Sequence, residues 1–468
     1  MLETYGIISI LPIAIALALS FWTRDALLSL LVGCIIGVMI MGQNPVRGMA
    51  VLFQDALGNA DFIWVLFIEV FIGILVAYFM KSGAIKAFID WIEGKKLSKR
   101  GTEIMAYLLG IFVFFSDYFS PLYVGNVMRP LTDNAKTSRE FLAFVCDCTS
   151  SPICCLIPFT SWGVYVAGLV VGMGCITDAA MGQAVVVGAF KFNFYCWAIL
   201  ILNGLLAVGI FPHFGPMRKA QKRALETGEV FAKNSTPLLS DELDTIKPND
   251  TCKPNLFLDF LVPAIIIIGV TCGTYFAIGS ARTLEAFIFA VFYQFLIMWV
   301  RKSATVKQMM ETAVLGIKAV LAAICILAMA YCMNSITKGL GAANYLINLT
   351  ESWMTPFWLL TITFIICALI SFLTGSSWGT YAIMLPITLP LAFGISGGEM
   401  APVVYATVAA VMGGGCFGDH CSPISDTTIL SSLAAGCDHI DHVKTQMPYA
   451  LLAAVIGCVG YMIIGATL

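Results

Sequence analysis

Long apolar runs dominate this chain and limit it to folds that lie in a lipid bilayer. A helix needs about 20 apolar residues to cross the hydrocarbon. Only 12% of the residues are charged, against about 25% in soluble proteins, and the mean hydropathy is +0.89. No soluble core buries so much apolar sequence, so we expect an all-α polytopic membrane protein whose main partner is the lipid bilayer. Candidate spans lie at 5–21, 26–42, 62–80, 140–171, 183–211, 256–278, 283–300, 312–334, 402–435 and 446–467.

Charge and cysteine usage exclude two further kinds of protein. The net charge of −2 argues against a strongly basic nucleic-acid binder. Most of the 16 cysteines lie inside apolar runs, where cysteine usually acts as a small hydrophobe. The CDC run at 146–148 and the CC pair at 154–155 lack the spacing of a zinc site. We therefore expect no nucleic-acid partner, no metal held by thiols and no resident cofactor.

Two further apolar stretches, 104–131 and 356–394, are interrupted in the middle by polar or small residues. Irregular backbone at membrane depth is tolerated where it lines a protein cavity. Each stretch is therefore predicted to be a re-entrant hairpin, and two ordinary helices joined by a short loop are the alternative. The interrupting residues include Asp117 and Ser120 in the first stretch and Gly375, Ser376 and Ser377 in the second.

The distribution of basic residues gives an orientation. If the N-terminus lies outside and both hairpins return to their side of entry, the loops 81–103 and 213–255 are cytoplasmic. All but five of the 26 Lys and Arg residues then lie inside, as the positive-inside rule requires. The exceptions are Arg47, Arg282, Lys338, Lys191 and Lys318.

Short matches between the two halves predict an internal repeat. They occur in the same order, and the halves begin on opposite sides of the membrane, as in inverted-topology transporters. We expect two inverted repeats of five spans, at 1–212 and 256–468, joined by a cytoplasmic linker at 213–255. The linker is interpreted as a solvated connector that is helical near 216–228, with a regulatory role as the alternative. The matches are AYFMKS (77–82) with AYCMNS (330–335), SPLYVGNVMRP (120–130) with SSWGTYAIMLP (376–386), and DCTSSP (147–152) with GDHCSP (418–423).

The segment 402–435 is too polar for an ordinary membrane helix. Asp419 and Asp426 flank Pro423, and buried carboxylates are costly in a bilayer unless they are paired or solvated. The proline predicts a broken helix, and its freed carbonyls, with hydroxyls and carboxylates, are ligands for a hard cation such as Na⁺. Asp419, Ser422, Asp426 and Thr427 are therefore candidate cation or proton ligands. The alternative is that the two aspartates cap the half-helices.

The first half carries a matching polar segment within 140–171, predicted to be the second broken helix. Its two prolines and its polar cluster are expected to face 402–435 across the substrate path. Ser151 is the candidate for direct ligation, so that Na⁺ would contact Asp419, Ser422, Asp426 and Ser151. The polar cluster consists of Asp147, Thr149, Ser150 and Ser151, and Asp147 is a further candidate cation or proton ligand.

Four other features add candidates along the substrate path. Asp117 at the first hairpin tip could bind a cation or amine, or cap the returning helix. Glu69 is an isolated intramembrane acid and is either a proton carrier or a structural acid. The second tip, at 375–377, offers helix N–H groups that suit an anion. Trp162 and Trp378 could line a pocket for an organic solute.

The run GDHCSPISDTTILSS at 418–432 resembles the signature of the NhaC family of Na⁺/H⁺ antiporters, in the ion transporter superfamily. The segments 147–163 and 117–133 resemble matching motifs of that family, so the resemblance covers essentially the whole chain. It implies two inverted repeats, Na⁺ and H⁺ as coupling ions, and residence in a bacterial inner membrane with the N-terminus periplasmic. Relatives of this kind are often homodimers. The match carries cation-binding roles onto Asp419, Ser422, Asp426 and Thr427, with Ser151 and Asp117 following from the other motifs.

Three functions remain open at this point. The first is Na⁺/H⁺ antiport by alternating access, and the second is Na⁺-coupled exchange or uptake of a small organic acid, malate- or lactate-like, or of an amino acid. An intramembrane enzyme is the third, but His420 and Ser422 are spaced unsuitably for catalysis. No Walker A sequence is present, which argues against an ATP-driven pump. The run GCDHIDHVK at 436–444 is interpreted as a plain polar turn.

Overall fold

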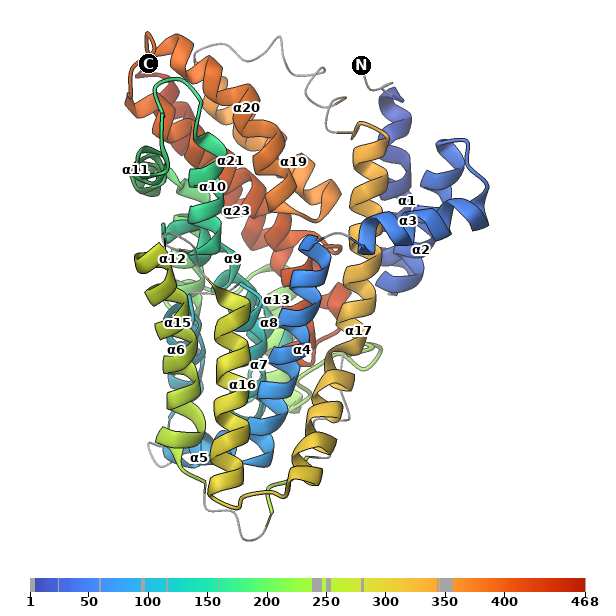
Figure 1. Ribbon diagram of the computed structural model, residues 1–468, viewed down its shortest axis with the longest axis vertical. Coiled ribbons are helices and arrows are strands. Elements are labelled where there is room, and N and C mark those ends of the chain that lie inside the picture. Colours follow the sequence, from blue (N-terminus) through green and yellow to red (C-terminus); the bar gives the residue numbers. More distant parts are fainter. Residues whose placement is uncertain are drawn as a thin grey trace.

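The computed structural model describes residues 5–23, 25–58, 60–93, 97–114, 117–158, 160–237, 246–249, 254–278, 282–342, 345 and 357–467. Within these ranges the regular structure is helical, and no strand occurs in them (Figure 1). The all-α class expected from the sequence is therefore confirmed.

Helices of very different lengths follow one another along the chain (Figure 1). The first half and the linker contain η1 (Gly6–Ile10), α1 (Leu11–Thr23), α2 (Ala26–Ile40), α3 (Pro45–Leu57), α4 (Ala60–Lys81), α5 (Ala84–Glu93), α6 (Lys99–Phe112), α7 (Phe119–Asn134), α8 (Arg139–Cys148), α9 (Ser151–Leu156), α10 (Ser161–Val170), α11 (Ala179–Ala189), η2 (Phe190–Phe192), α12 (Phe194–Val208) and α13 (Gly215–Thr227). The second half contains η3 (Phe257–Leu261), α15 (Val262–Ile278), α16 (Thr283–Val300), α17 (Val306–Gly339), α19 (Leu359–Thr374), α20 (Ser377–Ile395), α21 (Pro402–Cys421), α22 (Asp426–Ala435) and α23 (His439–Gly465).

Several of the described helices are long and apolar enough to cross a membrane. Two bent helix pairs also qualify, α2 with α3 at 109° and the α11–η2 segment with α12 at 51°. Helix α20 qualifies on its own, although the sequence predicted it as one arm of a hairpin. The five unbroken segments are Phe62–Lys81, Phe257–Ile278, Thr283–Val300, Ser377–Ile395 and His439–Gly465.

The expectation of one uninterrupted span over 183–211 is wrong. The chain leaves α11, makes the 3₁₀ turn η2 and bends by 51° before α12 begins. Asn193 sits at the bend with φ −79° and ψ 68°, outside the helical region.

The helices form two packed groups that each draw on both halves of the chain. In the outer group, α2 and α4 pack on the long helix α17, and α4 also contacts α16 (Figure 1). In the inner group, α21 packs between α19 and α20, while α22 packs on α7 and α8. The groups meet where α4 contacts α7 and where α17 contacts α22. Helices from opposite halves are therefore neighbours in both groups.

Each interrupted apolar stretch packs on a helix break of its own half. The turn between α19 and α20 has Gly375 at φ 64°, and a Cβ there would lie 2.6 Å from the carbonyl oxygen of Ile424. Helix α6 approaches the α8–α9 break as closely, because a Cβ on Gly110 would lie 2.0 Å from Thr149 Oγ1. Only glycine permits these approaches, which place the turn and α6 directly against the irregular backbone.

The first part of the 213–255 linker is docked on the helices rather than free in solvent. Helix α13 packs against α8 and α23, and it supplies the helix predicted near 216–228. Arg223 Nη2 donates to both carboxylate oxygens of the buried Glu140, at 2.8 and 2.9 Å. The interpretation as a solvated connector is wrong for this part, while 238–245 and 250–253 lie outside the described residues.

Candidate ion-binding site

The break between α21 and α22 is made by Ser422, Pro423 and the two residues after them. Helix α21 ends at Cys421, and Ser422 adopts an extended conformation. The Ser422 hydroxyl donates a hydrogen bond to the carbonyl of Phe372 at 2.8 Å, and this bond holds the break against the end of α19. The carbonyl of Pro423 is hydrogen-bonded to His439 Nε2 at 2.7 Å. Side chains thus replace the helical hydrogen bonds that the proline removes.

Asp419 lies in the last turn of α21 and is buried between two serine hydroxyls. Ser425 Oγ donates to one carboxylate oxygen at 2.6 Å, and Ser377 Oγ donates to the other at 3.2 Å. Ser377 is the first residue of α20, so the second hairpin turn and the second break meet at this carboxylate. The structure therefore brings together two residues that the sequence singled out separately.

Asp426 begins α22 and shares the Ser425 hydroxyl with Asp419. Its Oδ1 accepts from the backbone N–H of Thr427 at 2.8 Å and lies 3.5 Å from Ser425 Oγ. Its Oδ2 accepts from Tyr118 Oη at 2.8 Å. Ser425 Oγ is also 3.2 Å from Thr427 Oγ1, so two carboxylates and two hydroxyls form one oxygen cluster. Asp426 is partly exposed, whereas Asp419 and Ser425 are buried.

Asp117 and Glu69 add two buried acids beside this cluster. Both carboxylate oxygens of Glu69 and one oxygen of Asp117 are buried without a hydrogen-bond partner. Glu69 interacts electrostatically with Asp117 and with Asp426. Among the described residues, no ion pair involves any of these three acids or Asp419. Buried carboxylates without cationic partners are costly, so the cluster favours a bound cation or protons.

Asp147 belongs to a separate hydrogen-bond network between the two broken helices. Its Oδ2 accepts from Gln446 Nε2 at 2.8 Å and is 3.2 Å from His442 Nε2. Gln446 also donates to the carbonyl of His420. The His420 ring, in turn, is hydrogen-bonded to Tyr195 Oη at 2.8 Å. This network joins α8, α12, α21 and α23, and no hydrogen bond connects Asp147 to Asp419 within the described residues.

Most hydroxyl groups at the first helix break donate hydrogen bonds to backbone carbonyls, and one hydroxyl has no partner. Thr149 Oγ1 donates to the carbonyl of Val145 at 2.8 Å, and Ser150 Oγ donates to that of Asp147 at 2.7 Å. Ser120 Oγ donates to the Thr149 carbonyl at 3.4 Å. Ser151 Oγ is buried without a partner, which leaves it available as a ligand.

Aromatic side chains from both halves meet near the second hairpin turn. The rings of Trp162 and Trp378 lie 5.7 Å apart, and Trp162 is 5.9 Å from Tyr381. The Trp162 indole N–H is buried and neighbours the Asp117 carboxylate. Trp378 follows Ser376 and Ser377 at the start of α20, so the two tryptophans lie beside the predicted substrate path rather than apart from it.

Sequence reasoning missed the uncharged residues that donate hydrogen bonds to these carboxylates. Tyr118 and Ser425 carry no charge and attracted no attention. The interpretation of 436–444 as a plain polar turn is wrong, because His439 and His442 are buried at the start of α23. The sequence did contain a pattern that predicts a helix here, because the polar residues 439, 442 and 446 recur at helical spacing and form one polar stripe on an otherwise apolar helix.

Comparison with known proteins shows the family of this chain. The sequence model of the Na⁺/H⁺ antiporter family matches residues 153–466. An uncharacterised protein of Haemophilus influenzae is 32% identical, and the alignment covers 98% of this chain and 91% of that protein. The malate-2H⁺/Na⁺-lactate antiporter of Bacillus subtilis is 27% identical over 44% of each chain. The Na⁺/H⁺ antiporter NhaC of Alkalihalophilus pseudofirmus is 31% identical over 33% of each chain. Because the family model matches well over half of its residues, this chain belongs to the Na⁺/H⁺ antiporter family.

Proposed function

We propose that the protein exchanges Na⁺ for H⁺ across a bacterial inner membrane, and that both ions use the carboxylates of Asp419 and Asp426. The observation that carries this proposal is Ser425, whose hydroxyl lies 2.6 Å from one carboxylate and 3.5 Å from the other. A buried oxygen cluster without a cationic side chain suits a hard cation. The same carboxylates, when protonated, lose the charge that holds the cation, so protons and Na⁺ compete.

The proposed Na⁺ ligands are Asp419, Asp426, Ser422 and Ser151, with Thr427 beside them. Ser151 qualifies because its buried hydroxyl has no partner. The hydroxyl of Ser422 already donates to Phe372, but its oxygen retains a lone pair for a cation. Asp147 is assigned to holding the two broken helices together, through His442 and Gln446.

Glu69 is the proposed proton carrier that supplies the cluster. Both of its oxygens are buried and unpartnered on α4, and they interact electrostatically with Asp117 and Asp426. An intramembrane acid without a partner is a functional candidate by default. Protonation of Glu69 relieves the repulsion among the three carboxylates, so the proton bound there and the Na⁺ at Asp426 are coupled.

The proposed architecture is two inverted repeats, with the N-terminus periplasmic and the inner helix group moving against the outer group. Two observations support it. Each interrupted stretch packs on a break of its own half, at Gly110 and at Gly375. Helices from both halves contribute to each group, as expected for repeats related by an axis in the membrane plane. A homodimer is the proposed assembly.

Exchange of a small organic acid is the second candidate function. It is favoured by the contact of Trp162 with Trp378 and by the start of α20 beside them, where N–H groups suit a carboxylate. The two candidates are separated by proteoliposomes with an imposed Na⁺ gradient. Antiport predicts that the internal pH changes without any organic solute. If the pH changes only after malate or lactate is added, organic-acid exchange replaces antiport as the function.

A further inference from the structure

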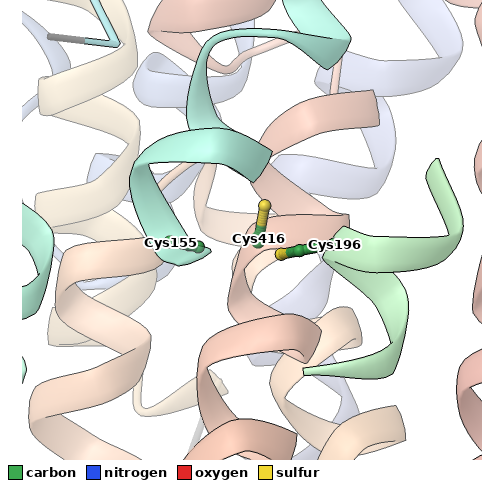
Figure 2. Close-up of side chains that lie close together, drawn as sticks. All are labelled: Cys155, Cys196 and Cys416. Atoms are coloured by element: carbon green, nitrogen blue, oxygen red, sulfur yellow. The ribbon is translucent and has the colours of Figure 1, made fainter. Parts of the chain in front are cut away.

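Three buried thiols from three separate helices converge in the protein interior. Cys155 lies on α9, Cys196 on α12 and Cys416 on α21, and Figure 2 shows their side chains meeting between these helices. Their Sγ atoms all lie within 4.8 Å of one another. The side chains are 4%, 0% and 0% exposed, respectively. No local sequence pattern predicts this group of thiols, because the three cysteines come from distant parts of the chain.

The separations of the sulfur atoms suit a single metal ion. A zinc ion binds thiolate sulfur at about 2.3 Å, which places three coordinating sulfurs about 4 Å apart. Separations below 4.8 Å therefore require only a small contraction around an ion.

Two polar side chains border the three thiols. The Asn193 side chain neighbours the Cys196 thiol, and its Oδ1 is buried without a hydrogen-bond partner. The Tyr381 hydroxyl lies 3.4 Å from Cys155 Sγ, and it donates to the carbonyl of Met412 at 3.0 Å. The Asn193 and Tyr381 side chains thus supply polar groups at the edge of the three thiols.

We propose that Cys155, Cys196 and Cys416 form a binding site for a soft, thiophilic cation of the Zn²⁺ or Cu⁺ class. Thiolates select soft ions, whereas the oxygen cluster at Asp419 selects hard ions, so the two sites bind different kinds of cation. Each thiol that becomes a thiolate releases one proton. A divalent ion bound by two thiolates and one neutral thiol is electrically neutral, which limits the cost of burying it.

The site has a structural consequence because of the helices that it joins. Helix α9 belongs to the first break, α21 leads into the second, and α12 packs on both. A bound ion would cross-link them and stabilise the folded protein by an amount that grows with the logarithm of the ion concentration above Kd. This inference does not depend on antiport, because its test measures metal rather than transport.

The test uses Cd²⁺ as the probe and the full-length protein in detergent. The partly or fully exposed cysteines 175, 272, 325 and 458 are first replaced by alanine to remove unspecific thiols. Cd²⁺ is supplied either to the reduced, purified protein or during expression, so that a buried site can also fill during folding. We expect about one tightly bound Cd²⁺ per chain, a thiolate-to-metal charge-transfer absorption, and a higher melting temperature.

The matched comparison replaces equal numbers of buried thiols at and away from the site. Cys155→Ala with Cys416→Ala should abolish the absorption and the bound metal, while Cys34→Ala with Cys367→Ala should leave both intact. Cys196→Ala alone serves if the first double variant does not elute as a folded protein. Equal Cd²⁺ binding by both double variants would overturn the proposal. So would the absence of metal after both loading routes, or a disulfide between two of the three cysteines.

Discussion

Tyr118 donates a hydrogen bond to Asp426 across 2.8 Å, and this contact joins the two halves of the chain at the ion site. Tyr118 immediately precedes α7, and Asp426 begins α22. These helices are in close contact, because a Cβ on Gly125 would lie 2.5 Å from the Cβ of Ala434. The carboxylate that we assign to Na⁺ is thus oriented by a residue from the other half of the chain.

Tyr118→Phe should weaken Na⁺ binding without unfolding the protein. The substitution removes one hydrogen bond to a charged group, which contributes about 1.5 kcal/mol or more. We expect the KM for Na⁺ to rise about tenfold, with the maximal rate less affected. Tyr293→Phe is the matched control, since it also removes one hydroxyl, which donates to Leu258 at 3.2 Å. An unchanged KM in Tyr118→Phe would remove this tyrosine from the site.

Glu69→Gln should separate Na⁺ movement from H⁺ movement. Glutamine keeps the size of the side chain but cannot release a proton. If Glu69 carries the proton, the variant should still exchange ²²Na⁺ for Na⁺ across the membrane while losing Na⁺-driven pH change. Full pH coupling in the variant would make Glu69 a structural acid, the alternative that its sequence context leaves open.

The sequence could predict the broken helices because their causes are local. Pro423 removes a helical hydrogen bond, and the serines beside it offer substitutes, so the break at 422–425 follows from adjacent residues. The bend at Asn193 was missed because its apolar flanks read as one continuous span. The partners of Asp147 and Asp426 were also missed, because His442, Gln446 and Tyr118 lie about 300 residues away in sequence. Such pairs are created by packing and leave no local pattern.

Arg223→Ala should destabilise the protein far more than Lys222→Ala on the same helix. Arg223 pairs with Glu140, whose side chain is 3% exposed, so its loss leaves a buried carboxylate unpaired at a cost of about 3 kcal/mol. The Lys222–Glu226 pair is exposed, and such pairs contribute about 0–1 kcal/mol. Thermal unfolding in detergent measures both. Equal melting temperatures would mean that α13 is only loosely attached.

Protonation of His213 should lower the stability of the folded protein in mild acid. Burial, together with the nearby Lys99 charge, lowers the pKa of His213 from 6.5 to about 4. The imidazole packs edge-on against Phe141, with ring centroids 4.9 Å apart. Since the folded pKa lies below the unfolded one, its contribution is complete above pH 6.5 and is lost as the pH falls towards 4. His213→Gln should flatten this part of the melting-temperature profile, and an unchanged slope would contradict the assignment.

The central claim is that Na⁺ and protons compete for Asp419 and Asp426, and equilibrium binding of ²²Na⁺ to the purified protein tests it most directly. We predict that wild-type binding weakens as the pH falls, and that Asp419→Asn and Asp426→Asn each abolish it while the proteins remain folded. Glu399→Gln, which alters an exposed acid, should bind as the wild type does. Binding that is independent of pH, or that survives both asparagine substitutions, would contradict the account.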